Sequence, residues 1–209
     1  MSGEHQVPGK SSKQRFLDHV LSLTQKPNSL LCFSEWAAIS EFDIQLEYQT
    51  DESRVEFVQM VQNLTGSATT NGIRLMGKPG IGKTRLVLET IRQLGLEDGT
   101  VYAAAPESLP GNLFSCLALA KEQPIILVVD NCSYRDVRAI WDSAQLAGSH
   151  VHVITIESLV GNPPSNSQFP IHILQPLGHE ARQNIVRQLY DLHGTYTFND
   201  DKAAYPEET

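Results

Sequence analysis

The chain has few cysteines, no long apolar run and no excess of positive charge. Its three cysteines, Cys32, Cys116 and Cys132, form no C-x-x-C pair and leave one thiol unpaired under any disulfide scheme. We therefore expect reduced thiols and a cytoplasmic protein. The apolar runs fall well short of the ~20 residues that cross a bilayer, so no membrane-spanning helix is predicted. The polar residues 1–13 lack the apolar region of a secretory signal peptide.

The charge balance is acidic. The chain carries 16 Lys and Arg against 24 Asp and Glu, for a formal net charge of -8 at pH 7. This balance argues against broad, sequence-independent binding to nucleic acid, although it leaves room for a local basic patch. With 209 residues, 41% of them hydrophobic, the chain is long enough for one or two domains with a substantial core.

One segment carries a specific chemical pattern. It is the G-x-x-x-x-G-K-T phosphate-binding loop, formed by Gly77, Lys78, Pro79, Gly80, Ile81, Gly82, Lys83 and Thr84. Residues 73–76 before it have the pattern of a buried strand, and residues 85–94 after it are typical of an amphipathic helix beginning at Arg85. This order turns backbone N–H groups toward a polyphosphate. We predict that these eight residues and Arg85 bind a nucleoside triphosphate, because a chance glycine-rich turn would not explain the flanking pattern.

The residues of this loop have distinct chemical roles. The glycines let the backbone approach the phosphates closely. Lys83 supplies a positive charge to the β and γ phosphates, and the Thr84 hydroxyl is suited to hold the Mg²⁺ that neutralises the same oxygens. The N-terminus of the following helix adds unpaired N–H donors and a partial positive charge.

A second motif lies further along the chain. Residues 125–130 are five consecutive aliphatic residues followed by Asp130, the pattern of a strand buried on both faces that ends in an acid. Asp130 lies 46 residues after Thr84, with one strand–helix unit between them. We predict that Asp130 is the Walker B acid and a magnesium ligand.

The residue after this acid bears on catalysis. Asn131 can hydrogen-bond a water molecule but cannot take its proton, which predicts slow hydrolysis or a nucleotide-held switch. We assign Lys83, Asp130 and Asn131 to the candidate catalytic set. Asp136 or Glu157 could supply a carboxylate instead, although Asp136 fits a solvated helix start better.

Short apolar strands alternate with helices along the chain. Beside residues 73–76, strands are predicted at 100–104, 125–130, 151–156 and 171–174. Helices are predicted at 15–24, 53–64 (with Ser53 as N-cap), 85–94, 112–121, 134–147 and 180–192. The alternation predicts an α/β, doubly wound, three-layer domain whose ligand lies at the carboxyl ends of the strands.

The order of these motifs resembles the STAND branch of the AAA+-like P-loop ATPases, which includes the NB-ARC and NACHT switch proteins. The matching parts are the phosphate loop, the Asp130 strand, the strand at 151–156, and Leu-Gln-Pro-Leu-Gly-His-Glu-Ala at 174–181. The segment 51–54, Asp-Glu-Ser-Arg, is similar to an acidic-Arg segment near the family's adenine pocket. The resemblance covers residues 52–194.

The resemblance implies a parallel five-stranded sheet in the order 5-1-4-3-2, preceded here by a short helical segment. The strand at 151–156 would then sense the γ-phosphate, with Thr155 as the polar sensor; the arginine that relatives often carry there is absent. The resemblance also predicts a division of the chain into an N-terminal tail and helical segment (1–50), a P-loop NTPase core (51–177), and the start of a helical lid with a polar tail (178–209).

The resemblance also implies ligands and partners. ATP or ADP with Mg²⁺ is expected, and the absence of an N-K-x-D guanine motif favours adenine. Because the family continues into further domains, we expect the N-terminal part of a longer protein, with C-terminal domains of its own chain as partners and nucleotide-dependent self-association.

Three functions stay open at this stage. The first is an ATP-driven molecular switch with slow magnesium-dependent hydrolysis. The second is an AAA+ ATPase accessory to DNA transactions, against which the net charge counts. The third is a non-catalytic module that holds ADP or ATP.

Other residues have simpler interpretations. His150 and His152 could share a strand face, but without a third ligand nearby a metal site is disfavoured. Arg135 and Arg138 could reach a neighbouring subunit as arginine fingers, although surface ion pairing is the preferred interpretation. Trp36 and Trp141 are expected to be core or interface anchors.

Overall fold

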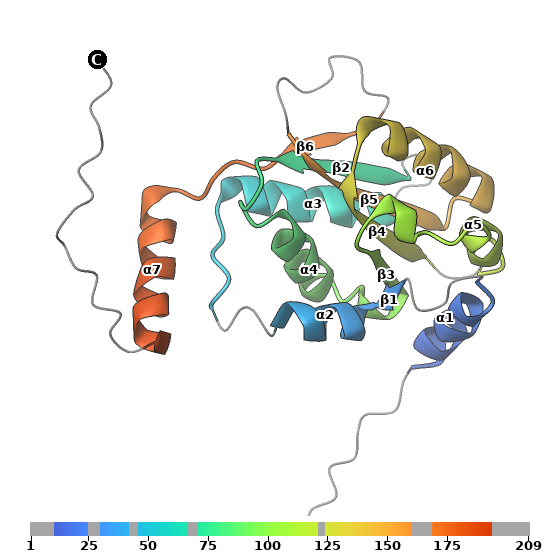
Figure 1. Ribbon diagram of the computed structural model, residues 1–209, viewed down its shortest axis with the longest axis horizontal. Helices are drawn as coiled ribbons and strands as arrows, with labels where there is room; N and C mark the ends of the chain where they lie inside the picture. The colour runs from blue at the N-terminus through green and yellow to red at the C-terminus, as the bar shows by residue number, and fades with distance from the viewer. Residues whose placement is uncertain are drawn as a thin grey trace, which may run out of the picture.

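A computed structural model describes residues 11–24, 30–41, 46–66, 71–120, 124–159 and 169–193 (Figure 1). Its helices are α1 (Ser12–Ser22), α2 (Phe33–Glu41), α3 (Glu52–Gly66), α4 (Lys83–Gln93), α5 (Leu113–Leu117), α6 (Tyr134–Ala147) and α7 (His179–His193). Its strands are β1 (Leu31–Cys32), β2 (Gly72–Gly77), β3 (Thr100–Ala103), β4 (Ile125–Cys132), β5 (Val151–Ser158) and β6 (Ile171–Ile173).

The strands form one mixed sheet of six in the order β1-β3-β4-β5-β2-β6. The parallel strands run β6-β2-β5-β4-β3, which is the expected 5-1-4-3-2 order. The prediction of a five-stranded parallel sheet was incomplete, because β1 adds an antiparallel strand beside β3. A strand of two residues is too short to show an alternating pattern, so nothing in the sequence marked it.

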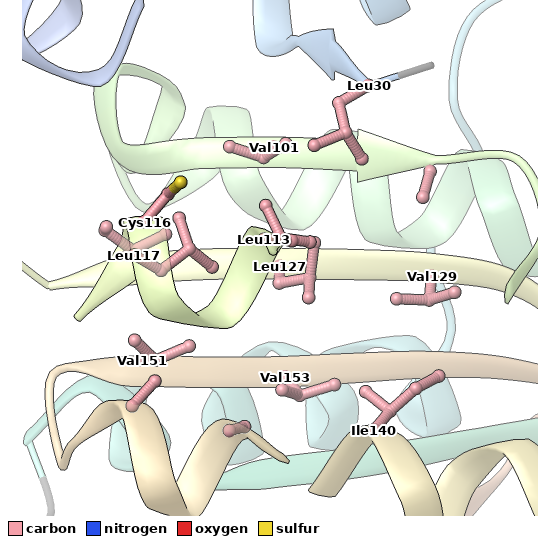
Figure 2. Packing of buried hydrophobic residues seen from close by; sticks show 14 of the residues in the cluster. Leu30, Val101, Leu113, Cys116, Leu117, Leu127, Val129, Ile140, Val151 and Val153 are labelled. Carbon is pink, nitrogen blue, oxygen red and sulfur yellow. The ribbon is translucent and has the colours of Figure 1, made fainter. Parts of the chain in front are cut away.

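Helices cover both faces of this sheet. Residues of α1, α5 and α6 form one buried cluster with alternate residues of the strands, and residues of α2, α3 and α4 form the other. In β4, Leu127 and Val129 belong to the first cluster and Ile126 and Val128 to the second, which explains the unbroken aliphatic run. Figure 2 shows part of the first cluster, where side chains from β3, β4 and β5 lie close to α5 and α6.

The N-terminal segment packs onto this domain. Leu17 and Val20 of α1 belong to the first cluster, while Phe33 and Trp36 of α2 belong to the second. Helix α1 begins earlier than predicted because Ser11 caps it, accepting a hydrogen bond from the backbone N–H of Gln14 at 3.1 Å. The expected boundary at residue 50 stays a prediction.

Four other helices differ from the predicted bounds, α4 and α7 by only one or two residues at each end and α3 and α5 in ways that matter more. The predicted Ser53 cap of α3 is wrong: the helix begins at Glu52, and the Asp51 carboxylate accepts a hydrogen bond from the Arg54 backbone N–H at 3.0 Å. The predicted helix at 112–121 is reduced to α5, Leu113–Leu117. By contrast, α6 has the predicted bounds. Among the described residues, no helix is long and apolar enough to cross a membrane.

Candidate nucleotide-binding site

The phosphate loop joins the end of β2 to the start of α4. Gly80 and Gly82 have φ values of 77° and 89°, which L side chains rarely adopt, and a Cβ built on either would meet no heavy atom within 4 Å. The glycines therefore serve backbone geometry, and the space beside them is open. No side chain caps α4 at Gly82, so its first N–H groups are free to face an anion.

Lys83 lies at the base of this loop and is 9% exposed. Its ammonium donates hydrogen bonds to the carbonyl oxygens of Gly77 at 3.0 Å and Lys78 at 2.9 Å. Burial lowers the pKa of Lys83, and the carboxylate of Asp130 opposes that shift. The loop thus holds one buried positive charge beside its open face.

Thr84 and Asp130 meet at the carboxyl edge of the sheet. The Thr84 hydroxyl donates to Oδ2 of Asp130 at 2.7 Å. The same carboxylate accepts the Tyr102 hydroxyl on Oδ2 at 3.3 Å and the Asn131 backbone N–H on Oδ1 at 2.7 Å. The structure therefore brings Thr84 and Asp130 together, and their joint role as magnesium ligands stays a prediction.

The donor set suits magnesium. A hydroxyl and a carboxylate oxygen side by side are hard oxygen ligands, and Mg²⁺ is held in proteins by one or two such groups together with substrate phosphates. The described residues contain no group of three or more His, Cys, Asp or Glu side chains that could hold a metal by themselves. Thr84 and Asp130 thus fit a magnesium ion that arrives with a polyphosphate.

Asn131 follows Asp130 at a bulge in β4. Its φ is 53°, and it is the sole non-glycine residue with positive φ in the part of the chain that the structure describes. Asn tolerates this conformation better than most residues. Its amide nitrogen donates to the Ala104 carbonyl at 3.0 Å, and its side chain is exposed. Asn131 therefore stands at the edge of the candidate site with a defined orientation.

The end of β5 differs from the sequence expectation. Thr155, expected to sense the γ-phosphate, has no exposed surface, and its hydroxyl donates to Oε1 of Glu157 at 3.2 Å. Glu157 in turn accepts the Arg74 guanidinium, with Nε at 2.8 Å from Oε1, and is 3% exposed. Thr155 lies opposite Arg74 in the sheet, three residues before the Ser158–Gly77 pair, and its hydroxyl is bonded within this buried group. Its role as a γ-phosphate sensor stays a prediction. Ser158, which pairs with Gly77 across the sheet, is the exposed residue there.

The remaining carboxylate of interest, Asp136, belongs to a helix cap. It accepts the Ser133 backbone N–H at 2.8 Å, and Ser133 accepts the Asp136 N–H at 3.5 Å, which forms a capping box at the start of α6. The hydrogen bonds from Ser133 lower the pKa of Asp136. The helix-start interpretation of Asp136 is confirmed.

A pocket of about 180 Å³ opens beside the phosphate loop. It is lined by Leu46, Glu47, Tyr48, Gln49, Arg54, Gly80, Ile81, Gly82, Arg85, Leu177 and Ile185. Its walls come from the chain before α3, from the loop, and from α7 with the residues leading into it; Figure 1 shows α7 on the far side of the chain that enters α3. Aromatic and aliphatic walls next to a phosphate cradle suit a flat heterocyclic base.

Two arginines frame this pocket. Arg54 is 3% exposed, donates to the Ile81 carbonyl at 3.2 Å and forms an ion pair with Asp51 at 2.6 Å. Arg85 pairs with Glu89 at 2.5 Å. The family resemblance implied that the 51–54 segment lies near a base pocket, and in the structure Arg54 lines the pocket beside the phosphate loop. Sequence patterns did not mark Leu46, Tyr48 or Ile185, since no motif singles them out.

The other singled-out residues lie elsewhere. His152 is buried, and His150 bonds to the Leu117 carbonyl at 3.0 Å. Arg135 and Arg138 are exposed on α6, and the surface ion pairs expected for them are absent among the described residues.

The two tryptophans are core anchors as expected. Trp36 is 2% and Trp141 4% exposed. Trp36 stacks on Tyr102 of β3, and Trp141 lies against Phe169 with 4.0 Å between ring centroids.

No protein-family model and no curated protein matches the chain. Solved structures do match it. The C. elegans PCH-2 structure aligns with a TM-score of 0.50 at 14% identity, covering 71% of this chain and 51% of that chain. A structure of the S. cerevisiae Hsp104:casein complex aligns with a TM-score of 0.51 at 16% identity, covering 83% of this chain and 34% of that chain. The chain thus spans about half of the length of the first of these matched chains and about a third of the second. The chain shares the α/β fold of these two structures.

Proposed function

We propose that this chain is an ATP-binding P-loop domain that acts as a nucleotide-dependent switch and hydrolyses ATP slowly in the presence of Mg²⁺. The observation that carries the proposal is the 2.7 Å contact between the Thr84 hydroxyl and the Asp130 carboxylate, directly beside the open glycine loop. The contact joins two motifs that are far apart in the sequence, and each is the expected partner of the other in a triphosphate site.

The proposed placement of the nucleotide follows from the surfaces described. The phosphates lie on the loop of residues 77–84, where α4 presents free N–H donors and Lys83 its charge. The base enters the neighbouring pocket between Tyr48 and Ile185, with Arg85 at its edge. Thr84 and Asp130 would hold Mg²⁺, which supplies charge neutralisation at the phosphate oxygens when bound.

We propose slow hydrolysis because none of the three positions considered for taking a proton from water has a free carboxylate: one position carries an amide, and the carboxylates at the other two are bound to neighbouring groups. Asn131 stands directly after the Walker B acid and cannot take a proton from water. Glu157 is neutralised by Arg74, and Asp136 is used in a helix cap. The same three facts also support the second candidate, a non-catalytic module that holds ADP or ATP, and turnover measurements separate the two.

The switch itself is proposed to involve α7. The backbone N–H of Glu47 donates to the Gln188 side chain at 2.7 Å, so the chain before α3 and the helix α7 are already in contact. Leu177 and Ile185 close the base pocket from that side. A base between these walls would favour this position of α7 over others, and its loss would remove that preference. Assignment to the STAND branch and contact with further domains rest on the motif resemblance alone.

The test is calorimetric titration of the purified protein with ATP, ADP and GTP in magnesium, together with identification of any nucleotide released on denaturation. Lys83→Ala is expected to weaken ATP binding by about 100-fold or more, because the loop loses its buried charge. Arg15→Ala, which removes one exposed positive charge from α1, is the matched control and should bind as the wild type does. Equal affinities for all three proteins would overturn the site.

A further inference from the structure

A stacked aromatic pair lies directly behind the candidate magnesium ligand. The Tyr102 hydroxyl donates to Oδ2 of Asp130 at 3.3 Å, the oxygen that also accepts from Thr84. The ring of Trp36 lies flat on the Tyr102 ring, with 4.5 Å between centroids and 4° between planes. Asp130 is therefore one hydrogen bond and one ring stack away from α2.

The residues around this stack hold it tightly. Strand β1 pairs with β3 so that Leu31 lies opposite Tyr102. Phe33 meets Trp36 edge to face at 5.8 Å. Trp36 is 2% and Tyr102 9% exposed. Residues 31–41, which we call the β1–α2 segment, thus rest on the strand that presents Tyr102, and close packing leaves the rings little room to move independently.

The β1–α2 segment has a second connection to the site, through α4. The Arg92 guanidinium lies over the Phe33 ring at 5.9 Å and pairs with Glu89 at 3.6 Å. Glu89 also pairs with Arg85, which lines the base pocket. The segment is therefore linked to Asp130 through Tyr102. It is linked to Arg85 through Arg92 and Glu89.

We infer that the β1–α2 segment responds to magnesium occupancy at Asp130, and that the Tyr102 hydroxyl is the group that couples them. The inference rests on the proposed nucleotide function. Oδ2 of Asp130 accepts two hydrogen bonds at once, so any cation drawn to this oxygen weakens or lengthens the bond from Tyr102. The Tyr102 ring shifts with its hydroxyl, and the stacked Trp36 shifts with the ring.

Packing alone does not explain why residue 102 is a tyrosine. A phenylalanine would stack on Trp36 and fill the same volume, whereas the hydroxyl adds a polar atom whose hydrogen bond is directed at a functional carboxylate. Tyr102 is in this view a positioning residue: it orients Asp130 and does not take part in chemistry. The contrast between the two side chains also supplies the test, because Tyr102→Phe removes one oxygen and leaves the stack.

The experiment follows Trp36 fluorescence during titration with Mg²⁺ and ATP, and with ATP plus EDTA. The Trp36→Phe variant reports the emission of Trp141 alone and is subtracted. In the wild type, Trp36 emission should change with Mg²⁺–ATP and stay constant with ATP plus EDTA. Tyr102→Phe should still bind Mg²⁺–ATP in calorimetry, should need about tenfold more Mg²⁺, and should lose the Trp36 response.

A second measurement needs no variant. Hydrogen exchange of the backbone amides of residues 31–41 in the wild type should slow or quicken with Mg²⁺–ATP relative to ATP plus EDTA. A full Trp36 response in Tyr102→Phe overturns the coupling, as does unchanged exchange in the wild type while calorimetry shows binding. If calorimetry instead shows no binding of Mg²⁺–ATP to the wild type, the proposed function is overturned, and the inferred coupling is overturned together with it.

Discussion

Neighbouring strands β4 and β5 each carry a carboxylate near the same edge of the sheet, and the two are held in opposite ways. Asp130 accepts hydrogen bonds from neutral donors: two hydroxyls, of Thr84 and Tyr102, and a backbone N–H. Glu157 is paired with the guanidinium of Arg74 and is 3% exposed. Neutral donors orient a carboxylate without cancelling its charge, whereas a guanidinium neutralises it. Of the two carboxylates, Asp130 is the one that keeps the charge required by the proposed cation site.

The comparison also explains why the buried pair is part of the framework. Arg74 lies on β2, three residues before the loop begins, and Glu157 precedes Ser158, which pairs with Gly77. The Leu159 backbone N–H donates to the Gly77 carbonyl at 2.9 Å. The Tyr134 ring lies against the Arg74 guanidinium, with 5.3 Å between the ring centroid and Cζ, so the start of α6 also contacts the buried pair. The pair thus ties together the strands that frame the phosphate loop.

The largest predicted effect is on the buried pair. Arg74→Met leaves Glu157 without a counter-charge in a desolvated place and should lower the free energy of unfolding by about 3–5 kcal/mol. Urea denaturation measures it. Arg138→Met, on the exposed face of α6, is the control and should change little. If both variants lose the same small amount, the pair is not the structural element described.

The double variant Arg74→Met/Glu157→Leu sharpens the same point. Replacing both charges with apolar side chains removes the unpaired carboxylate, so stability should return to within about 1–2 kcal/mol of the wild type. Recovery in the same urea assay would assign the loss in Arg74→Met to desolvation of Glu157. A double variant as unstable as the single one would point to lost packing around Arg74 instead.

Asp130→Asn is predicted to act on ligand binding and leave the fold in place. The amide keeps the size of the side chain but not its charge, so magnesium should no longer strengthen ATP binding, a loss of about tenfold or more in affinity. The free energy of unfolding should stay within about 1 kcal/mol of the wild type. Calorimetry and urea denaturation on one preparation check both. A variant that unfolds like Arg74→Met would erase the distinction between the two carboxylates.

The smallest effect is expected at a third carboxylate, Asp136, which is solvated and serves a helix cap. Asp136→Ala should cost about 0.5–1 kcal/mol at pH 7. Because the folded-state pKa is lowered, the unfolded chain binds protons first as the pH falls. The stability from this carboxylate is fully present above about pH 4 and is lost progressively as the pH falls through the lowered folded-state pKa, so the difference between the two proteins should shrink below about pH 4. A difference that does not shrink as the pH falls would mean that the carboxylate is not the source.

The parts of the site that sequence could predict are those set by local pattern. The glycine loop, its flanking strand and helix, and the aliphatic strand ending in Asp130 depend on contiguous residues. The parts that it missed depend on pairing across the chain. The sequence around Thr155 contains no pattern that predicts Arg74 beside it, so the buried pair of Arg74 and Glu157 could not be predicted.

The N-terminal part shows the same limit. Strand β1 is two residues long and forms because it pairs with β3. Tyr102 of β3 and Trp36 of α2, far apart in the sequence, stack on each other beside that pairing. The pocket beside the phosphate loop likewise joins Leu46 with Ile185, which are distant in sequence and carry no motif. Long-range contacts of this kind are decided by tertiary packing, which overrides local propensity.

The most direct test of the account is the affinity of the wild-type protein for ATP, measured by calorimetry once in magnesium and once in EDTA. If Thr84 and Asp130 form a metal site beside the phosphate loop, ATP should bind in both conditions and bind more tightly in magnesium, by about tenfold or more. Equal affinity in the two conditions, or no binding in either, would contradict the account.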